Sequence, residues 1–189
     1  DAAPNGEGVY LRVIDYKSGS TGFKLDEVYY GLRLQLIAYL DAVVENAAVL
    51  WGKEAVPAGV FYFEVKNPLI QGNVDGPEKA ELEVLKSFRL KGLVLAEGEA
   101  VELMHRGLAG NSHVIPVGVK KDGSFTARSK VVLREQFEWL RRHFRDVAKR
   151  RGQRILAGEI AVSPFAKGNR TACDYCGLKA VCRFDVACG

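Results

Sequence analysis

The sequence lacks several features that would assign it to a class at once. It has no apolar run long enough to cross a membrane, and residues 1–8 lack the basic and apolar regions of a secretory signal peptide. Its three histidines, at positions 105, 113 and 143, are scattered, and there is neither a G-x-S-x-G nucleophile elbow nor a phosphate-binding loop. We therefore expect a cytoplasmic protein with no membrane contact, no serine-hydrolase chemistry and no ATP site on this chain.

Cysteine is also absent from residues 1–172, and all four cysteines lie between Cys173 and Cys188. A disulfide framework would spread its cysteines through the fold, so this clustering excludes one. Clustered cysteines with a two-residue spacing instead indicate a metal or cluster site in a reducing compartment.

What is present is ordinary for one globular domain. The chain has 189 residues, of which 48% are hydrophobic and 26% are charged, with a net charge of +4. A chain of this size can bury one sizeable core. The small positive charge permits a nucleic-acid partner without requiring one.

Hydrophobic patterning predicts alternating strands and helices. An apolar strand over residues 8–17 ends in the turn 18–22, and residues 57–59 open a second strand that runs to Val65. A loop is expected over 67–77 and a hairpin around Asp122-Gly123. The expected helices cover residues 27–45, 78–90, 99–105 and 133–156. The first should carry an apolar stripe that includes Leu32, and the second one formed by Leu82, Leu85 and Phe88. Strand, helix and strand within about sixty residues indicate an α/β unit.

Asp15 and Lys17 lie at the end of the first strand. Residues two apart on a strand project from the same face, and the carboxyl end of a strand is where open α/β folds place their sites. A carboxylate suits Mg²⁺, and a lysine beside the ion can orient a water or stabilise phosphate charge. A solvated Asp–Lys pair at the end of a strand is the alternative interpretation.

Gln35 and Tyr39 are four residues apart in the next expected helix, so they share one face. A glutamine among apolar neighbours needs a hydrogen-bond partner. Either it supports a site with Tyr39, or it caps a strand edge while Tyr39 packs in the core.

The segments Val-Ile-Asp-Tyr-Lys-Ser-Gly (13–19) and Tyr-Tyr-Gly-Leu-Arg-Leu-Gln-Leu-Ile-Ala-Tyr-Leu (29–40) resemble the PD-(D/E)XK nuclease superfamily. More narrowly, they are similar to the nuclease domains of bacterial recombinational-repair helicase–nucleases of the AddAB type, in particular the C-terminal domain of the AddB-type chain. That family has an I-D-Y-K-S/T pattern followed by a Q-x-x-x-Y helix. Residues 57–63, 119–125 and 173–185 extend the resemblance over nearly the whole chain.

The resemblance implies a restriction-endonuclease-like α/β fold, with a mixed sheet flanked by helices and a cysteine-rich tail. It divides the chain into a nuclease-like domain (1–165) and the tail (166–189). Asp15 would be the second metal-binding carboxylate, the backbone carbonyl of Tyr16 would complete the Mg²⁺ shell, and Lys17 would be the catalytic lysine. Gln35 and Tyr39 would support the site and contact DNA or the attacking water.

The chain departs from the family pattern at two places. The family's first metal-binding Asp belongs to a Gly-x-Ile-Asp-Arg strand that precedes Asp15, and Asp1 matches a later Asp of that strand. The family's first cluster cysteine lies far upstream of the nuclease core. We therefore expect that the chain is a piece of a longer protein and is almost inactive by itself.

The tail has the spacing C-x2-C-x5-C-x5-C. The resemblance implies that Cys173, Cys176 and Cys182 hold a [4Fe–4S] cluster with a fourth, upstream cysteine, as such a cluster needs four thiolates. Cys188 as a substitute ligand, a zinc ion, and four free thiols are the alternatives.

Arginines and lysines crowd the last long helix. Arg141 and Arg145 are candidate DNA contacts, although a solvated face partly paired with acidic residues explains most of these charges as well.

The function implied is a Mg²⁺-dependent exonuclease domain of a double-strand-break repair complex. It would cut single-stranded DNA beside a helicase–nuclease partner subunit of the AddA type. The alternatives are a non-catalytic DNA-binding scaffold of the same complex and a CRISPR-associated exonuclease of similar fold.

Overall fold

The structure is a computed structural model that describes residues 1–6, 8–65, 68, 76–168 and 170–184. The chain divides into two compact units, residues 1–147 and 148–189, which are described separately. The boundary predicted at residue 165 lies inside the second unit. Most of the loop predicted over 67–77, and Cys188, lie outside the described residues.

A mixed five-stranded sheet forms the centre of the first unit, with strand order β1-β2-β3-β4-β7. β2 and β3 are parallel, as are β4 and β7, whereas β1–β2 and β3–β4 are antiparallel. The strands are β1 (Ala2–Asn5), β2 (Gly8–Lys17), β3 (Ala55–Glu64), β4 (Lys91–Leu95) and β7 (Val131–Val132). This sheet, flanked by helices, confirms the predicted α/β fold class.

The two central strands are the ones that apolar patterning identifies best. Leu11 in β2 and Val60 and Phe61 in β3 are almost completely buried, as expected of strands covered on both faces. β3 begins two residues before the predicted opening at Pro57. That proline pairs with Leu11 at an irregularity in the β2–β3 register, one of the few places in a sheet where proline is tolerated.

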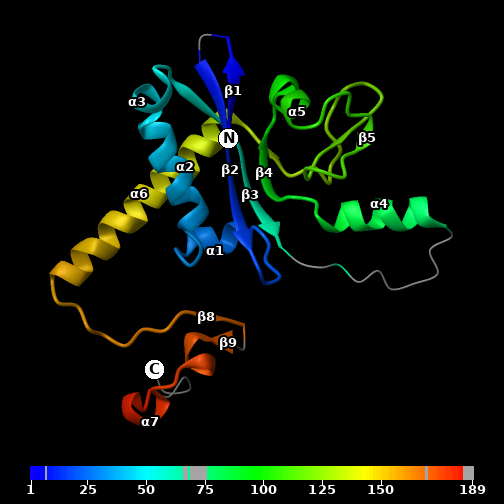
Figure 1. The fold of residues 1–189 in the computed structure, drawn as a ribbon. Helices are drawn as coiled ribbons and strands as arrows, with labels where there is room; N and C mark the ends of the chain where they lie inside the picture. Colours follow the sequence, from blue (N-terminus) through cyan, green and yellow to red (C-terminus); the bar gives the residue numbers. More distant parts are fainter. Residues whose placement is uncertain (7, 66–67, 69–75, 169, 185–189) are drawn as a thin grey trace. The chain divides into compact units, whose positions relative to one another are not determined.

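Helices cover both faces of the sheet, which Figure 1 shows nearly edge-on with α2 and α6 on one side and α5 on the other. Leu36, Ile37 and Leu40 of α2 pack with Val60 and Phe137 in one core cluster. A second cluster, around Phe61 and Val94, lies on the other face. The helices are α1 (Leu25–Tyr29), α2 (Gln35–Glu45), α3 (Ala47–Trp51), α4 (Pro77–Ser87), α5 (Gly98–Met104) and α6 (Arg134–Leu156).

The helix predicted over 27–45 is wrong in one respect, because the chain forms α1 and α2 with a break between them. Gly31 in the break has φ +76°, a backbone conformation that favours glycine. Leu32, predicted to lie on the apolar stripe, is consequently about half exposed. The break makes Gln35 the first residue of α2.

The sequence patterns fail in two further places. α4 buries no residue, so its predicted stripe of Leu82, Leu85 and Phe88 is not a core face. β4 and β7 do not follow from the sequence patterns. The hairpin predicted around Asp122-Gly123 is present but short, with one antiparallel bridge between Val119 and Phe125. β6 (Gly118–Val119) also pairs with β5 (Gly110–Asn111).

The second unit contains β8 (Ala166–Lys167), β9 (Arg170–Thr171), a 3-10 turn over Ala172–Tyr175 and α7 (Lys179–Cys182). A reciprocal cap between Thr171 and Asp174 fixes the start of the 3-10 turn. Within the described residues, we find no helix with the length and apolar character needed to span a membrane.

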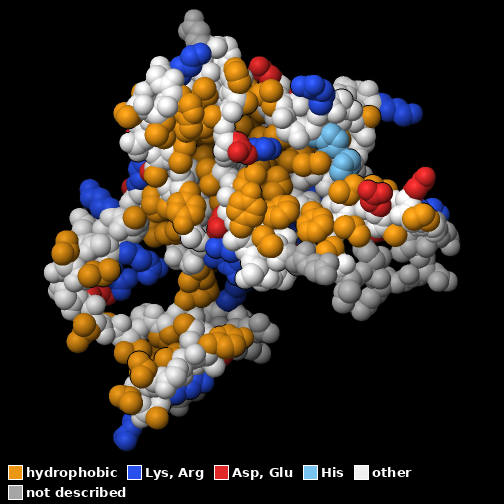
Figure 2. Space-filling model, viewed as in Figure 1, with side chains coloured by type: hydrophobic (Ala, Val, Ile, Leu, Met, Phe, Trp, Pro, Cys, Tyr) orange, Lys and Arg blue, Asp and Glu red, His pale blue; other side chains and the backbone are white. Residues whose placement is uncertain are grey.

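The outer edge of β2 is only partly covered. β1 pairs with residues 8–11, and Asp1 exchanges backbone hydrogen bonds with Arg12. From Val13 onward, β2 has no further strand neighbour on this side among the described residues. Figure 2 shows that the molecular face between α2 and α5, where β1 forms the edge, is largely hydrophobic.

Candidate active site at the carboxyl end of β2

Asp15 and Lys17 project from the α2 face at the end of β2, as strand alternation requires. Lys17 Nζ lies 2.8 Å from Asp15 Oδ2, and the Asp15 side chain is only 14% exposed. Asp15 Oδ2 is fully buried and, among the described residues, has no partner besides this ionic contact with Lys17. A buried carboxylate oxygen in this state still has room in its coordination for a further cation.

Gln35 and Tyr39 extend this pair into a chain of four side chains. Lys17 Nζ donates to Gln35 Oε1 at 2.9 Å, and Gln35 Nε2 donates to the Tyr39 hydroxyl at 2.7 Å. The start of α2 at Gln35 and the four-residue spacing place both side chains beside Lys17. The interpretation of Gln35 as a strand-edge cap and Tyr39 as core is therefore not supported, since Tyr39 is 46% exposed.

Two residues of β3 belong to the same edge, although sequence patterns alone do not single them out. The parallel register places Tyr62 beside Asp15 and Glu64 beside Lys17. Lys17 Nζ lies 5.8 Å from the centre of the Tyr62 ring. The available signal is a glutamate at the end of an apolar strand, which becomes informative only once the register with β2 is known.

Glu64 is buried and anchors the loop that follows Lys17. Its Oε1 accepts a hydrogen bond from the Thr21 backbone N–H at 2.8 Å and also contacts Lys91 Nζ on β4. Arg33 Nη1 donates to Thr21 Oγ1 at 2.7 Å. The loop between β2 and α1 is thus held from two sides.

The electrostatics of the site favour a charged lysine. The contact with the Asp15 carboxylate raises the pKa of Lys17 above its ordinary value, and burial raises the pKa of Tyr62. Lys17 is therefore a cation at neutral pH, suited to stabilising negative charge on a phosphate rather than to removing a proton.

The donors at this edge fit a hard divalent cation. Mg²⁺ typically binds through one or two carboxylates, together with substrate phosphates and waters, and the buried Asp15 Oδ2 supplies one such ligand. No group of three or more His, Cys, Asp or Glu side chains converges in the described part of the chain. An ion here would therefore take its other ligands from a further carboxylate, the backbone, substrate or water.

Strand alternation also directs the Tyr16 carbonyl to the open edge of β2. Lys17 O accepts from Val65 N–H on the β3 side, whereas Arg12 bonds to Asp1 on the opposite side. Backbone groups alternate between the two sides of a strand, so Tyr16 shares the direction of Arg12. The Tyr16 side chain is on the face opposite Asp15 and packs edge-on against Phe63, with ring centres 5.6 Å apart.

Arg141 and Arg145 belong to an ion network between α6 and α2. Arg141 is buried and donates to Asp41 at 2.9 Å, to Glu138 at 2.7 Å and to Glu45 at 2.5 Å. Arg145 contacts Asp41 and Glu45 as well. Because carboxylates already engage both charges, we propose a structural role for them in place of the DNA contact considered from the sequence.

The three described cysteines do not gather into a ligand set. Cys173 is partly buried, and Cys176 and Cys182 are exposed. One local feature suits a thiolate, since the Leu178 backbone N–H donates to Cys176 Sγ at 3.4 Å. The geometry of the described residues therefore does not itself form a cluster site.

The chain is similar to known nucleases along almost its whole length. Residues 1–183 match the profile of the PD-(D/E)XK nuclease superfamily. Three similar relatives are B chains of the enzyme named ATP-dependent helicase/deoxyribonuclease. The one from Pelotomaculum thermopropionicum is 47% identical over 190 residues, and the one from Bacillus thuringiensis is 45% identical over the same length. One from Thermoanaerobacter is 40% identical over 187 residues.

These alignments cover 98% of this chain but only 16% of each relative, so the chain spans about a sixth of their length. The superfamily match extends over the sheet, the Asp15–Lys17 edge and the Gln35–Tyr39 helix, which are the parts that form the candidate site. The chain belongs to the PD-(D/E)XK nuclease superfamily.

Proposed function

We propose that this chain is the metal-dependent DNA nuclease domain of a helicase–nuclease and hydrolyses phosphodiester bonds of single-stranded DNA. The observation that carries the proposal is the linked set Asp15, Lys17, Gln35 and Tyr39 at one strand end. The names of the relatives, which combine helicase and deoxyribonuclease, support the wider context.

Each side chain has a role that follows from its contacts. Asp15 and the Tyr16 carbonyl would hold Mg²⁺, which when bound polarises the phosphate and acidifies a coordinated water. Lys17 places a positive charge beside the phosphate. Gln35 orients Lys17 through its amide oxygen, and Tyr39 holds the Gln35 amide through its hydroxyl. Tyr39 is exposed enough to contact the DNA strand itself.

The β1 register suggests where a second carboxylate would enter. β1 is antiparallel to β2, with Ala2 opposite Leu11 and Asp1 bonded to Arg12. If β1 continued in this register, the third residue before Asp1 would lie opposite Asp15. Opposite residues of antiparallel strands share a face with Cβ atoms about 5 Å apart. An Asp there would complete the ion's carboxylate pair.

We therefore propose that residues 1–189 by themselves cleave DNA weakly, because the Asp that would stand opposite Asp15 in this register is not among them. A protein extended upstream to include that strand should cleave at least ~100-fold faster, the order expected for a lost charge-stabilising group. Equal cleavage by the two proteins would show that no second carboxylate is needed.

We also propose that Cys173, Cys176 and Cys182 hold a [4Fe–4S] cluster together with a cysteine elsewhere in the native protein. The C-x2-C-x5-C spacing and the N–H donated to Cys176 Sγ support this. The cluster would fix the second unit structurally. Iron and sulfide analysis of the anaerobically purified native protein should find four of each per chain, and Cys176→Ala should lose them. Zinc in their place would refute the cluster.

The nuclease proposal is tested with the native protein, together with its partner chain. Lys17→Ala should reduce Mg²⁺-dependent cleavage of a labelled single strand by about 10²–10³-fold, and Lys53→Ala, on an exposed surface, should leave it unchanged. Binding of DNA without cleavage in the unaltered protein would favour the non-catalytic scaffold.

A further inference from the structure

A pocket of about 540 Å³ lies on the first unit, lined by four cationic side chains. Lys86 comes from α4, Arg89 from the link to β4, Lys91 from β4, and Lys130 from the segment before β7. No Asp or Glu is among the described residues that line this pocket. The four cations come together only in the fold, since the sequence separates the first and last by more than forty residues.

The strand register places the pocket next to the candidate active site. Lys91 pairs with Tyr62 across β3 and β4 and contacts Glu64, which stands beside Lys17 in the register. Gly22 and Phe23, from the loop anchored by Glu64, form another wall of the pocket. The same loop therefore connects Lys17 to the pocket over six residues.

Arg89 shows that the pocket has unused positive charge. Its Nε donates to the Ile115 carbonyl at 2.8 Å, and no carboxylate among the described residues pairs with it. Burial without such a partner lowers the pKa of Arg89. In the described part of the chain Lys86 pairs only with Glu83, with both side chains about half exposed, a kind of pair that contributes little and is easily exchanged. An anionic ligand would supply the counter-charge that these two cationic side chains need.

We propose that this pocket binds the sugar-phosphate backbone of the single-stranded DNA substrate, next to the strand segment held at Lys17. The cations would contact phosphates, and the apolar side chains of Phe23 and Leu25, which line the same pocket, would pack against an unstacked base. Bases in a duplex are stacked inward and cannot reach such a surface. This inference rests on the proposed function and adds to it a second DNA-binding subsite.

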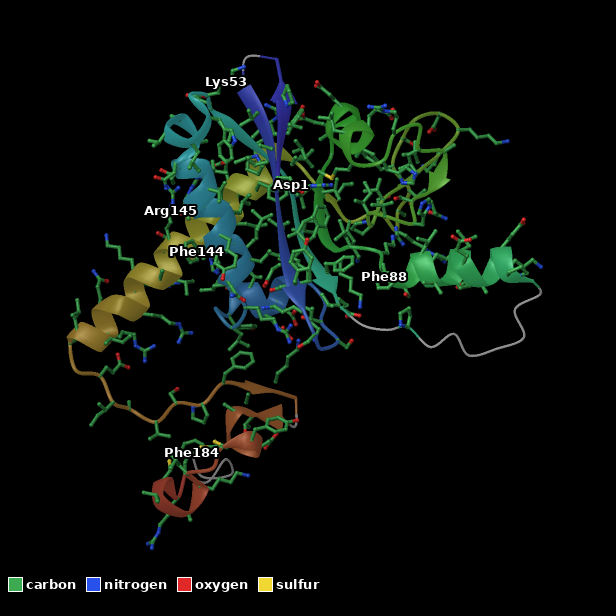
Figure 3. The ribbon with its side chains drawn as sticks, viewed as in Figure 1. Asp1, Lys53, Phe88, Phe144, Arg145 and Phe184 are labelled. Atoms are coloured by element: carbon green, nitrogen blue, oxygen red, sulfur yellow. The ribbon has the colours of Figure 1, made fainter. Side chains whose placement is uncertain are left out.

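Lysine footprinting on the native protein tests the subsite directly. The protein is acetylated with and without a single-stranded oligonucleotide, and a chelator is present in both samples so that no cleavage occurs. The modified lysines are then quantified by mass spectrometry. Lys86 and Lys130 should be protected by DNA, whereas Lys53 should not. Lys53 and Phe88, the sequence neighbour of Arg89, lie far apart in Figure 3, so Lys53 is a suitable internal control. Equal reactivity of Lys86 and Lys130 with and without DNA would overturn the proposal.

A double variant, Lys86→Gln with Lys130→Gln, supplies the quantitative test, because neither side chain is buried and folding should be unaffected. Each phosphate contact to a single strand adds about 0.7 to the slope of log K against log salt. Loss of two contacts should lower the slope by about 1.4 and the affinity at 0.1 M salt by about 25-fold. A slope and affinity equal to those of Lys53→Gln would refute the subsite.

The outcomes distinguish this inference from the proposed function. Footprinting and affinity are measured without cleavage, so they do not depend on nuclease activity. If the wild-type protein is inactive but DNA protects Lys86 and Lys130, the nuclease proposal is refuted and the subsite is supported. If cleavage depends on Lys17 but DNA does not protect Lys86 and Lys130, the nuclease proposal is supported and the subsite is refuted.

Discussion

The ion network between α2 and α6 gives a sharp prediction for Asp41. Asp41 accepts hydrogen bonds from Arg141 at 2.9 Å and from Arg145 at 2.7 Å, and both Asp41 and Arg141 are buried. Asp41→Asn keeps the size of the side chain and removes its charge. Arg141 then remains buried without its most buried counter-charge.

The size of the stability loss in Asp41→Asn depends on the carboxylates that still contact Arg141. Removing one partner of a buried ion pair costs about 3–5 kcal/mol. Glu45 and Glu138 still contact Arg141, but they are 55% and 49% exposed, so solvent screens them. We expect Asp41→Asn to cost about 3 kcal/mol of unfolding free energy. Glu138→Gln, which removes an exposed partner of the same arginine, should cost less than about 1 kcal/mol.

The cost should also depend on pH. Burial alone would raise the pKa of Asp41, but the hydrogen bond from Arg145 and the charge of Arg141 outweigh it, and the pKa falls below the ordinary 3.8. A lowered carboxyl pKa contributes stability that is present above the unfolded value and is lost as pH falls through the folded one. The difference between wild type and Asp41→Asn should be constant from neutral pH down to about pH 5 and shrink below about pH 4.

Urea unfolding, followed by circular dichroism, measures these differences at several pH values. An Asp41→Asn cost no larger than that of Glu138→Gln would refute the reasoning, as would a cost that does not change at acidic pH. The first result would show that the buried pair does not stabilise the contact between α2 and α6.

Two other predictions concern the sheet. A Cβ on Gly92 would lie 1.8 Å from the Val60 carbonyl oxygen, whereas one on Gly98 would meet nothing within 4 Å. Gly92→Ala should therefore lower the free energy of unfolding by about 3 kcal/mol or more, and Gly98→Ala should leave it almost unchanged. Thermal unfolding of the two variants measures the difference. The Tyr10 hydroxyl donates to Glu97 at 2.8 Å, and burial, with help from Glu97, raises the pKa of Tyr10 to about 12. Tyr10→Phe should cost about 1 kcal/mol at neutral pH and remove a tyrosine that titrates near pH 12 from the ultraviolet titration. An unchanged titration near pH 12 would contradict this assignment. The Tyr10 contribution is present below pH 10 and declines as the pH rises toward 12.

Local patterning is sufficient for the centre of the fold and for part of the site. β2 is mostly apolar and ends at Asp15 and Lys17, so its position and the shared face of these two residues follow from the sequence. The link from Gln35 to Tyr39 follows from helical spacing in the same way. The break at Gly31 escapes this reasoning because leucines at helical spacing continue across it, while a single glycine with φ +76° ends α1.

The remaining features depend on contacts between distant segments. Arg141 is surrounded by charges in the sequence and looks solvent-exposed, but its partner Asp41 is 100 residues away. The role of Glu64 depends on the register of β2 with β3. β4 has only five residues and follows a helical segment closely, so periodicity alone does not separate the two.

Asp15→Asn is the most direct test of the nuclease account. The change keeps the shape of the side chain and removes the charge that would hold the ion. Single-turnover cleavage of a labelled single strand is measured with the native protein over a range of Mg²⁺ concentrations, and DNA affinity is measured in a chelator. We expect a loss of about 10²–10³-fold in the cleavage rate at every Mg²⁺ concentration, with unchanged DNA affinity. Cleavage by Asp15→Asn at the wild-type rate would contradict the assignment of this strand end as the active site.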